Sequence, residues 1–246
     1  MAEIADSGFV EIESRFFHKL FAAFAALAVL SLLIHFCGRE MGARLSMGGH
    51  TDSLTTHEIV IGNDVVLAPA NQIRYPEQRR DGIANRVDLY VLWPDMNGFT
   101  EANRAAFNSM DDSRSLLFLS FEQRTLSRDM SGRLEPIYQK MALGPEEPLS
   151  AGLVRQKLPE SAGFVDEYLV VGPQTSGAVF VARCLDESKA SGTLAACERD
   201  IHVGEDLVLM ARFPASLLAD WQKLDAGLSE FVRKTVRTAP SGPAQD

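Results

Sequence analysis

A long uncharged apolar run near the N-terminus constrains the fold of this chain more than any other feature. Residues 20–37 read LFAAFAALAVLSLLIHFC and contain no Asp, Glu, Lys or Arg. A helix of about 20 apolar residues, rising about 1.5 Å per residue, crosses the hydrocarbon core of a bilayer of roughly 30 Å. The run therefore predicts a single transmembrane helix over residues 20–37, with the lipid bilayer as its partner.

The residues after this run distinguish an uncleaved anchor from an export signal that is removed. A cleavable signal has an apolar core of about 7–15 residues and ends at an A-x-A-like site, and no such site follows Cys37. Acylation of Cys37, as in a lipoprotein, would need a small residue before it, and the chain has Phe36 there. We therefore expect the segment to remain as a signal anchor.

Positive charges near the run bear on its orientation. Arg15 and Lys19 precede the run and Arg39 and Arg44 follow it, so the Lys and Arg bias that orients a transmembrane helix is tied. A short tail inside the cell and a large domain outside is the commoner arrangement for a single N-terminal anchor. We therefore expect a single-pass protein of the inner (cell) membrane, with a large extracytoplasmic C-terminal domain.

The rest of the chain is long enough to form a domain with a substantial core. Hydrophobic residues make up 46% of the 246 residues, and the net charge is −9. This acidity argues against nucleic acid as a partner, because phosphate binding needs clustered Lys and Arg. Composition divides the chain into a short tail (1–19), the anchor (20–37), a flexible stalk (38–56), an α+β domain (57–237, with a possible subdomain boundary near 143–159) and a disordered tail (238–246).

Alternating apolar and polar residues predict that this domain is dominated by β-sheet. Two short strand-like segments flank Gly62-Asn63, a pair that is typical of a tight hairpin turn. Further strands are expected near residues 86–93, 115–121, 164–171, 178–184, 195–203 and 207–213. The sequence lacks the pattern of long crossover helices that a parallel sheet needs. The expected class is α+β with a mostly antiparallel sheet.

The clearest helix of this domain follows Pro214. Apolar residues recur there at helical spacing and form one stripe; they are Leu217, Trp221, Leu224, Leu228, Phe231 and Val232. Arg233 and Lys234 lie near its end, where positive charge suits the helix dipole. We expect this C-terminal amphipathic helix to pack on the sheet, with a partner-binding helix as the alternative.

Two cysteines of the predicted domain suit a disulfide. Cys184 ends one strand-like segment and Cys197 begins another, with the turn-rich residues 186–192 between them. Two strands folded about that turn would place the cysteines opposite each other, as a cross-strand disulfide requires. An oxidising compartment allows this bond, whereas a reducing compartment would leave two buried thiols.

An arginine-rich segment is the best candidate for a binding surface. Residues 71–82 read NQIRYPEQRRDG, and the aromatic, turn-rich residues 93–99 read WPDMNGF. Arginine forks suit carboxylates and phosphates, and loops often carry binding residues. The candidate binding residues are Arg74, Tyr75, Arg79, Arg80, Trp93 and Phe99. The alternative is a structural loop whose arginines pair with its own carboxylates, Asp81 or Glu77.

Signals for catalysis or metal binding are weak. The motifs G-x-S-x-G, H-E-x-x-H and G-x-x-x-x-G-K-[ST] do not occur. His50, Asp52 and His57 carry metal-capable groups, but they fall in or beside the predicted stalk, whereas zinc ligands usually lie on rigid elements. Cys197 and His202 could form a thiol–imidazole pair, although a disulfide explains Cys197 more simply. We therefore expect neither metal nor cofactor, and we assign no catalytic residue.

These observations favour an interaction protein of the cell envelope. Its extracytoplasmic domain would bind another protein or an envelope component, or act as a scaffold. The alternative is a membrane-tethered envelope hydrolase with paired carboxylates, for which Asp88, Asp95 and Glu101 supply acids. A deep pocket that holds two carboxylates, one with a raised pKa, would favour the hydrolase, and a flat surface would count against it.

Overall fold

The computed structural model describes residues 14–46, 48–109, 114–173, 178–190 and 192–238. Residues 1–13 and 239–246, which make up most of the two predicted tails, lie outside the described residues. The chain divides into two compact units, with the division between Gly49 and His50.

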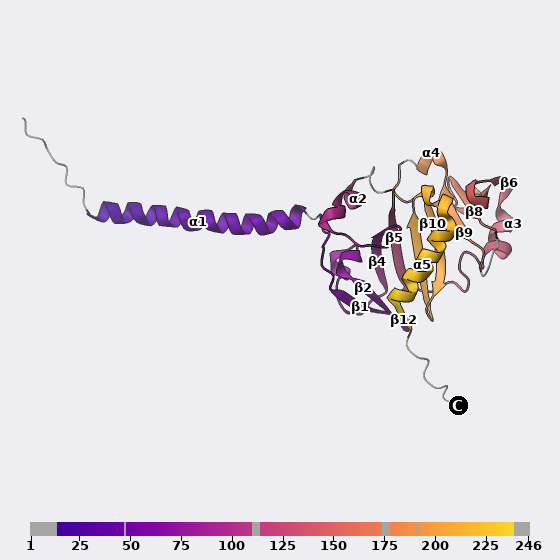
Figure 1. Ribbon diagram of the computed structural model, residues 1–246, viewed down its shortest axis with the longest axis horizontal. Helices are drawn as coiled ribbons and strands as arrows, with labels where there is room; N and C mark the ends of the chain where they lie inside the picture. Colours follow the sequence, from indigo (N-terminus) through magenta and orange to yellow (C-terminus); the bar gives the residue numbers. More distant parts are fainter. Residues whose placement is uncertain (1–13, 47, 110–113, 174–177, 191, 239–246) are drawn as a thin grey trace, which may run out of the picture. The chain divides into compact units, whose positions relative to one another are not determined.

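In the first unit the structure describes a helix, α1 (Ser14–Ser46) (Figure 1). It runs through residues 38–46, which the sequence assigned to a flexible stalk. No helix among the described residues is both long and apolar enough to cross a membrane. This finding contradicts the predicted transmembrane helix over residues 20–37, which is therefore wrong. The predictions of a bilayer partner and of a single-pass membrane protein lose their basis with it.

The second unit is built on a large antiparallel sheet, as the alternation predicted. Its order is β4-β5-β11-β10-β9-β8-β7-β6, and every neighbouring pair is antiparallel. The strands are β4 (Arg86–Leu92), β5 (Leu116–Gln123), β6 (Leu143–Pro148), β7 (Val154–Lys157), β8 (Glu167–Val171), β9 (Val181–Leu185), β10 (Cys197–Val203) and β11 (Leu207–Phe213). Residues 143–159, where a subdomain boundary was expected, thus contain β6 and β7, which extend this sheet.

A smaller sheet of order β12-β2-β1-β3 completes the β structure (Figure 1). Its strands are β1 (Thr56–Ile61), β2 (Asp64–Pro69), β3 (Gly82–Ile83) and β12 (Val236–Thr238). β1 and β2 pair about Gly62-Asn63, which confirms the predicted hairpin turn. β3 pairs with β1 in parallel, and it is the exception to the antiparallel pattern among the described strands.

The helices of this unit are short, except for the last. They are η1 (Ala70–Gln72), η2 (Pro76–Gln78), η3 (Glu101–Asn103), α2 (Arg104–Asn108), η4 (Leu134–Tyr138), α3 (Gln139–Met141), η5 (Ser150–Gly152), η6 (Glu160–Ala162), α4 (Glu187–Ala190), η7 (Ala215–Asp220) and α5 (Trp221–Thr235). η4 is a π-helical turn and the other η segments are 3-10 helices. Pro214 precedes η7, and the α-helix itself begins at Trp221.

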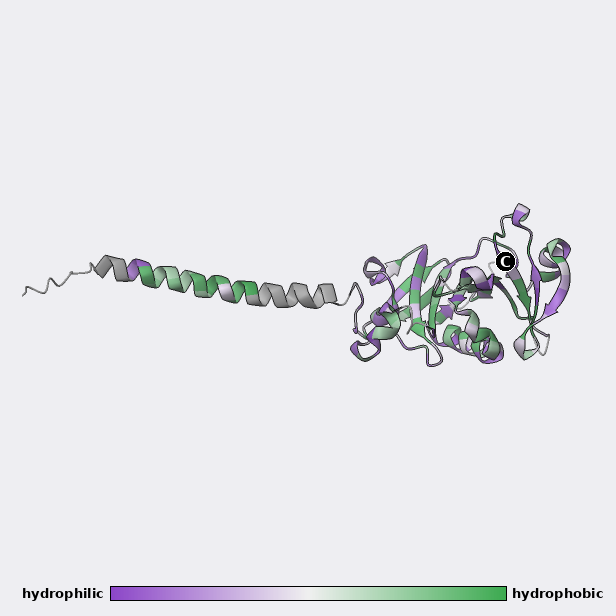
Figure 2. Ribbon diagram, turned by 90° about the horizontal axis from the view of Figure 1, so that it is seen from above, coloured by the Kyte–Doolittle hydropathy of each residue, from purple (hydrophilic) through white to green (hydrophobic). Residues whose placement is uncertain are grey.

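The main hydrophobic core lies between the large sheet, the small sheet and α5. From α5 it takes Trp221, Leu224, Leu228 and Phe231, which confirms the predicted apolar stripe and its packing on the sheet. Buried and more exposed residues alternate along β2 and β11, and Figure 2 shows hydrophobic and hydrophilic residues interspersed along the strands. Two smaller clusters cover parts of the opposite face of the large sheet, which we call the outer face.

Candidate functional site

The two segments selected as a candidate binding surface come together in the fold. The backbone N–H of Phe99 donates to the carbonyl of Asn71 (2.9 Å), and the Asn71 side-chain amide donates to the carbonyl of Phe99 (3.0 Å). Gln72 Nε2 donates to the carbonyl of Met96 (3.1 Å). Gly98 permits this approach, because a Cβ there would lie 2.7 Å from the Asn71 carbonyl oxygen. Residues 71–82 and 93–99 are therefore neighbours.

Within the arginine segment, Arg79 and Gln78 hold the loop in shape. Arg79 donates from Nε and Nη2 to the carbonyl of Ile73, at 3.2 and 3.0 Å. Gln78 accepts from the backbone N–H of Asp88 on β4 and donates to the Asp88 carboxylate, at 2.9 and 3.1 Å. The Arg74 N–H donates to the carbonyl of Asp88 (2.8 Å), so the loop lies along the edge of β4. Of the candidate residues, Arg79 thus has a structural role.

Arg74 and Arg80 differ from Arg79 because both are exposed. The Arg74 guanidinium lies 5.1 Å from the Tyr75 ring centroid and 4.9 Å from the Phe118 ring centroid. It makes no ion pair with any residue that the structure describes. The structural alternative paired the arginines of the loop with Asp81 or Glu77; of these two acids, Asp81 lies with its Oδ1 3.1 Å from His57 Nδ1 and accepts from the Glu58 N–H.

The loop borders an uncovered part of the outer face. On this face, Asp88 of β4, Ser120 of β5 and Met210 of β11 lie side by side in one row across the three strands. In the next row, Phe118 of β5 lies opposite Arg212 of β11. Phe118 and Met210 are half-buried and Arg212 is exposed, although all three lie on central strands of the sheet. We call this surface the arginine face; it consists of Arg74, Tyr75, Arg86, Phe118, Met210 and Arg212.

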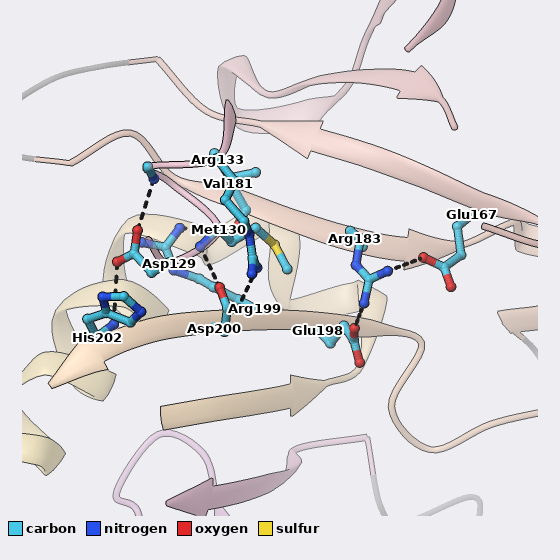
Figure 3. Close-up of polar contacts among 11 residues, drawn as sticks. Asp129, Met130, Arg133, Glu167, Val181, Arg183, Glu198, Arg199, Asp200 and His202 are labelled. Carbon is cyan, nitrogen blue, oxygen red and sulfur yellow. Dashed lines mark hydrogen bonds and ion pairs between the residues drawn. The ribbon is translucent and has the colours of Figure 1, made fainter. Parts of the chain in front are cut away.

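The neighbouring part of the outer face is covered by the segment that leads into η4 (Figure 3). The Asp200 carboxylate on β10 accepts from the Met130 N–H and from Arg133 Nη2, both at 2.5 Å. Asp129 Oδ2 accepts from the His202 N–H at 3.4 Å. These contacts attach the segment to β10 beside β11, where Met210 stays half-buried and Arg212 exposed. His202 is therefore part of this attachment, and not of a thiol–imidazole pair.

A row of alternating charges crosses the outer face beside this segment (Figure 3). Arg183 on β9 pairs with Glu198 on β10 and lies 3.2 Å from Glu167 on β8, while Arg212 lies 3.4 Å from Glu198. Burial raises the pKa of the Glu167 carboxyl, and the nearby Glu198 adds to this, while Arg183 opposes it. Sequence reasoning missed this row, because its members are far apart in the chain.

Two of the candidate aromatic residues are not available to a partner. Phe99 is fully buried. Its ring stacks on His50 with centroids 4.6 Å apart and meets Phe107 edge-on. Trp93 is half-buried and packs against the main core, where Gly227 of α5 approaches its ring. Both residues therefore serve packing, which sequence alone could not distinguish from an exposed role.

The carboxylates of the hydrolase alternative do not share a cavity among the described residues. Asp88 lies 2.7 Å from Arg86, and Glu101 lies 3.6 Å from Arg104. Asp95 lines a groove of about 610 Å³ between the 93–97 turn and α5. Glu230 also lines this groove, and Glu77 and Asp81 line a cavity of about 490 Å³, but hydrogen bonds lower the pKa of Glu230 and of Asp81, whereas an acid catalyst needs a raised pKa. Glu167 and Glu198 share a cavity of only about 160 Å³, in which arginines already pair with both acids. Ligand pockets are usually about 300–1,000 Å³.

The histidines and cysteines are placed as follows. His50 belongs to the aromatic cluster and His57 pairs with Asp81, so the two do not act together. No group of three or more His, Cys, Asp or Glu among the described residues is placed to hold a metal ion. Cys184 and Cys197 lie opposite each other on β9 and β10 and form a disulfide, as predicted.

No protein-family model and no curated protein sequence matches this chain. Its structure is similar to an immunity protein of the Stenotrophomonas maltophilia type IV secretion system, with 15% identity and a TM-score of 0.50, over 77% of this chain and 95% of that chain. It is also similar to the iron-regulated outer membrane lipoprotein FrpD of Neisseria meningitidis, with 9% identity and a TM-score of 0.43, over 75% of this chain and 98% of that chain. The first likeness shows a shared fold.

Proposed function

We propose that this chain is an extracytoplasmic protein-binding domain, and that it binds its partner through the arginine face. The observation that carries the proposal is the incompletely covered outer face of β5 and β11, where exposed Tyr75 and the half-buried Phe118 and Met210 lie among arginines. Aromatic residues, Met and Arg are the residue types enriched in protein–protein interfaces. A central sheet surface of this composition suits recognition of another protein.

The disulfide supports the extracytoplasmic location. Cys184 and Cys197 are joined across neighbouring strands. Such bonds form and persist in oxidising compartments and are rare in the cytosol. This support is independent of the N-terminal segment.

The comparison adds support of a weaker kind. A solved structure of this fold is named an immunity protein of a secretion system. A fold hosts many functions, so the likeness alone assigns none. For this chain the likeness is consistent with an envelope-associated, protein-binding role.

Photo-crosslinking in the cells that produce the protein tests the binding role. A benzophenone amino acid would replace Tyr75 on the arginine face or, as a matched control, exposed Ser229 on α5. We expect a discrete adduct with one other protein from position 75 and none from position 229. The absence of a specific adduct from position 75, in a variant that melts like the unmodified protein, would overturn the proposal.

Thiol labelling tests the compartment. In a Cys37→Ser variant, a membrane-impermeant maleimide is applied to intact cells whose outer barrier is made permeable, with and without prior reduction. We expect Cys184 and Cys197 to be labelled only after reduction. Labelling that needs cell lysis but no reductant would place the domain in the cytoplasm.

A further inference from the structure

We infer that the partner presents an acidic segment, and that a carboxylate of this segment binds Arg74. The inference deepens the proposed protein-binding function and rests on it. The first step is the environment of Arg74, whose guanidinium lies about equally far from two aromatic rings, 5.1 Å from Tyr75 and 4.9 Å from Phe118. Stacking on rings occupies the faces of a guanidinium and leaves its in-plane N–H donors for a planar anion.

The carboxylates nearest to the loop have other partners. Asp88 bonds to Arg86 and Gln78, and Asp81 bonds to His57 and the Glu58 N–H. Among the described residues, none supplies a hydrogen bond or an ion pair to the Arg74 side chain. Arg74 is therefore an ordered cation whose donors are available to another molecule.

The surroundings of Arg74 have room for one small group. A cavity of about 40 Å³ lies beside Arg74 and Arg86, with Phe118 and Met210 in its lining. A single water occupies roughly 10–15 Å³ by this kind of measure, so the space suits a carboxylate better than a ring. Arg212 and Asp88 also line this cavity, but Arg212 lies 3.4 Å from Glu198 and Asp88 lies 2.7 Å from Arg86. Among the described residues, Arg74 is therefore the lining cation that has no ion pair.

The charge of the whole chain selects among the possible anions. The net charge is −9, which disfavours nucleic acid and anionic membranes, because both present extended negative charge to the whole surface. A protein segment can instead place one or two carboxylates at a local positive site and apolar side chains on Phe118 and Met210. This combination of cation and apolar surface is the reason that we assign an acidic protein segment.

The test uses the partner captured from position 75, purified, with full-length protein. Binding constants are measured for the wild type, Arg74→Ala, Arg74→Lys and Arg237→Ala; Arg237 is an exposed arginine on β12, away from the arginine face. We expect Arg74→Ala to weaken binding at least tenfold and Arg74→Lys to be intermediate, because lysine keeps the charge and loses the planar fork. Arg237→Ala should stay within twofold, and raising the salt concentration should weaken the wild type more than Arg74→Ala.

The outcomes separate this inference from the proposed function. A partner that binds Arg74→Ala as tightly as the wild type, or whose crosslinked peptide contains no Asp or Glu, would overturn the acidic contact and leave protein binding intact. An adduct with a second copy of this chain would replace a separate partner with self-association. If no protein is captured and phosphatidylglycerol vesicles bind the wild type but not Arg74→Ala, both conclusions fail in favour of a lipid phosphate.

Discussion

At the scale of residues, the disulfide between Cys184 and Cys197 stabilises the folded protein because it restricts the unfolded chain. Their disulfide closes a loop with a sequence separation of 13, and a loop of this size is expected to contribute about 3 kcal/mol by restricting the unfolded state. We predict that Cys184→Ser/Cys197→Ser lowers the free energy of unfolding by about 2–4 kcal/mol in urea titration. Reduction of the wild type should produce the same loss, and an unchanged midpoint in both experiments would contradict this account.

His50 makes stability depend on pH. Its Nδ1 lies 2.7 Å from the Tyr90 hydroxyl and its Nε2 lies 3.3 Å from Asn108 Oδ1. Burial lowers the pKa of His50, and Arg79 and Arg104 lower it further, while the bond to Asn108 opposes them. The unfolded chain therefore binds a proton more readily than the folded protein does.

We predict that this histidine destabilises the fold in acid. The contribution of neutral His50 to the free energy of unfolding is fully present above pH 6.5, which is the ordinary pKa of histidine and applies to the unfolded chain. This contribution is lost as the pH falls toward the lower pKa that His50 has in the folded protein. The free energy of unfolding, measured between pH 8 and 5, should fall less steeply for His50→Gln than for the wild type. Equal slopes would show that other groups cause the dependence.

At the scale of elements, α5 contains a glycine where helix propensity alone would favour alanine. A Cβ at Gly227 would lie 2.6 Å from Trp93 Cζ3 and 3.4 Å from Met96 Cε. Glycine costs a helix about 1 kcal/mol relative to alanine. The close packing of α5 on the 93–97 turn offsets that cost.

We predict that Gly227→Ala lowers the free energy of unfolding by about 1 kcal/mol, because overpacking costs roughly 1–3 kcal/mol and exceeds the gain in propensity. Thermal and urea unfolding measure the change. Ala226→Gly, at the exposed neighbouring position, reports the propensity effect alone. A stabilised Gly227→Ala variant would mean that Trp93 moves aside without cost.

At the scale of the whole molecule, the two sheets are joined at their turns. Asp64, fully buried at the start of β2, accepts from the N–H groups of Glu205 and Asp206 and from the Thr238 hydroxyl. The turn before β11 allows this approach because Gly204 has a φ of +61°, and a Cβ there would lie 2.5 Å from Asp64 Oδ1. One carboxylate thus connects β2, β12 and the turn between β10 and β11.

We predict that Asp64→Ala costs about 2–3 kcal/mol of unfolding free energy, since it removes the buried acceptor of three part-buried hydrogen bonds. Asp206→Ala is the matched control: its carboxylate accepts longer bonds from the Asn63 N–H and Gln123, at 3.3 and 3.4 Å. The loss should be clearly smaller for Asp206→Ala, as measured by urea unfolding. Equal losses would mean that the buried carboxylate has no special role in joining the sheets.

Local patterns predicted much of this architecture. The alternation of strands, the Gly62-Asn63 turn, the stripe of α5 and the Cys184–Cys197 pairing each depend on residues close in sequence or on regular periodicity. The transmembrane helix is the exception, since an apolar run suggested a span that the described helices do not provide. Periodicity predicts elements well because it reports which side of an element is buried.

The sequence by itself therefore determined the β-rich class, the disulfide and the amphipathic C-terminal helix. Only the tertiary structure decided which arginines hold the loop and which are exposed, because Arg74 and Arg79 share one loop and differ only in what lies beside them. It likewise buried Phe99 and left Phe118 and Met210 only half-buried on β5 and β11. The physical reason is that exposure depends on which segment covers a sheet face, and that covering is made by contacts between residues far apart in the chain.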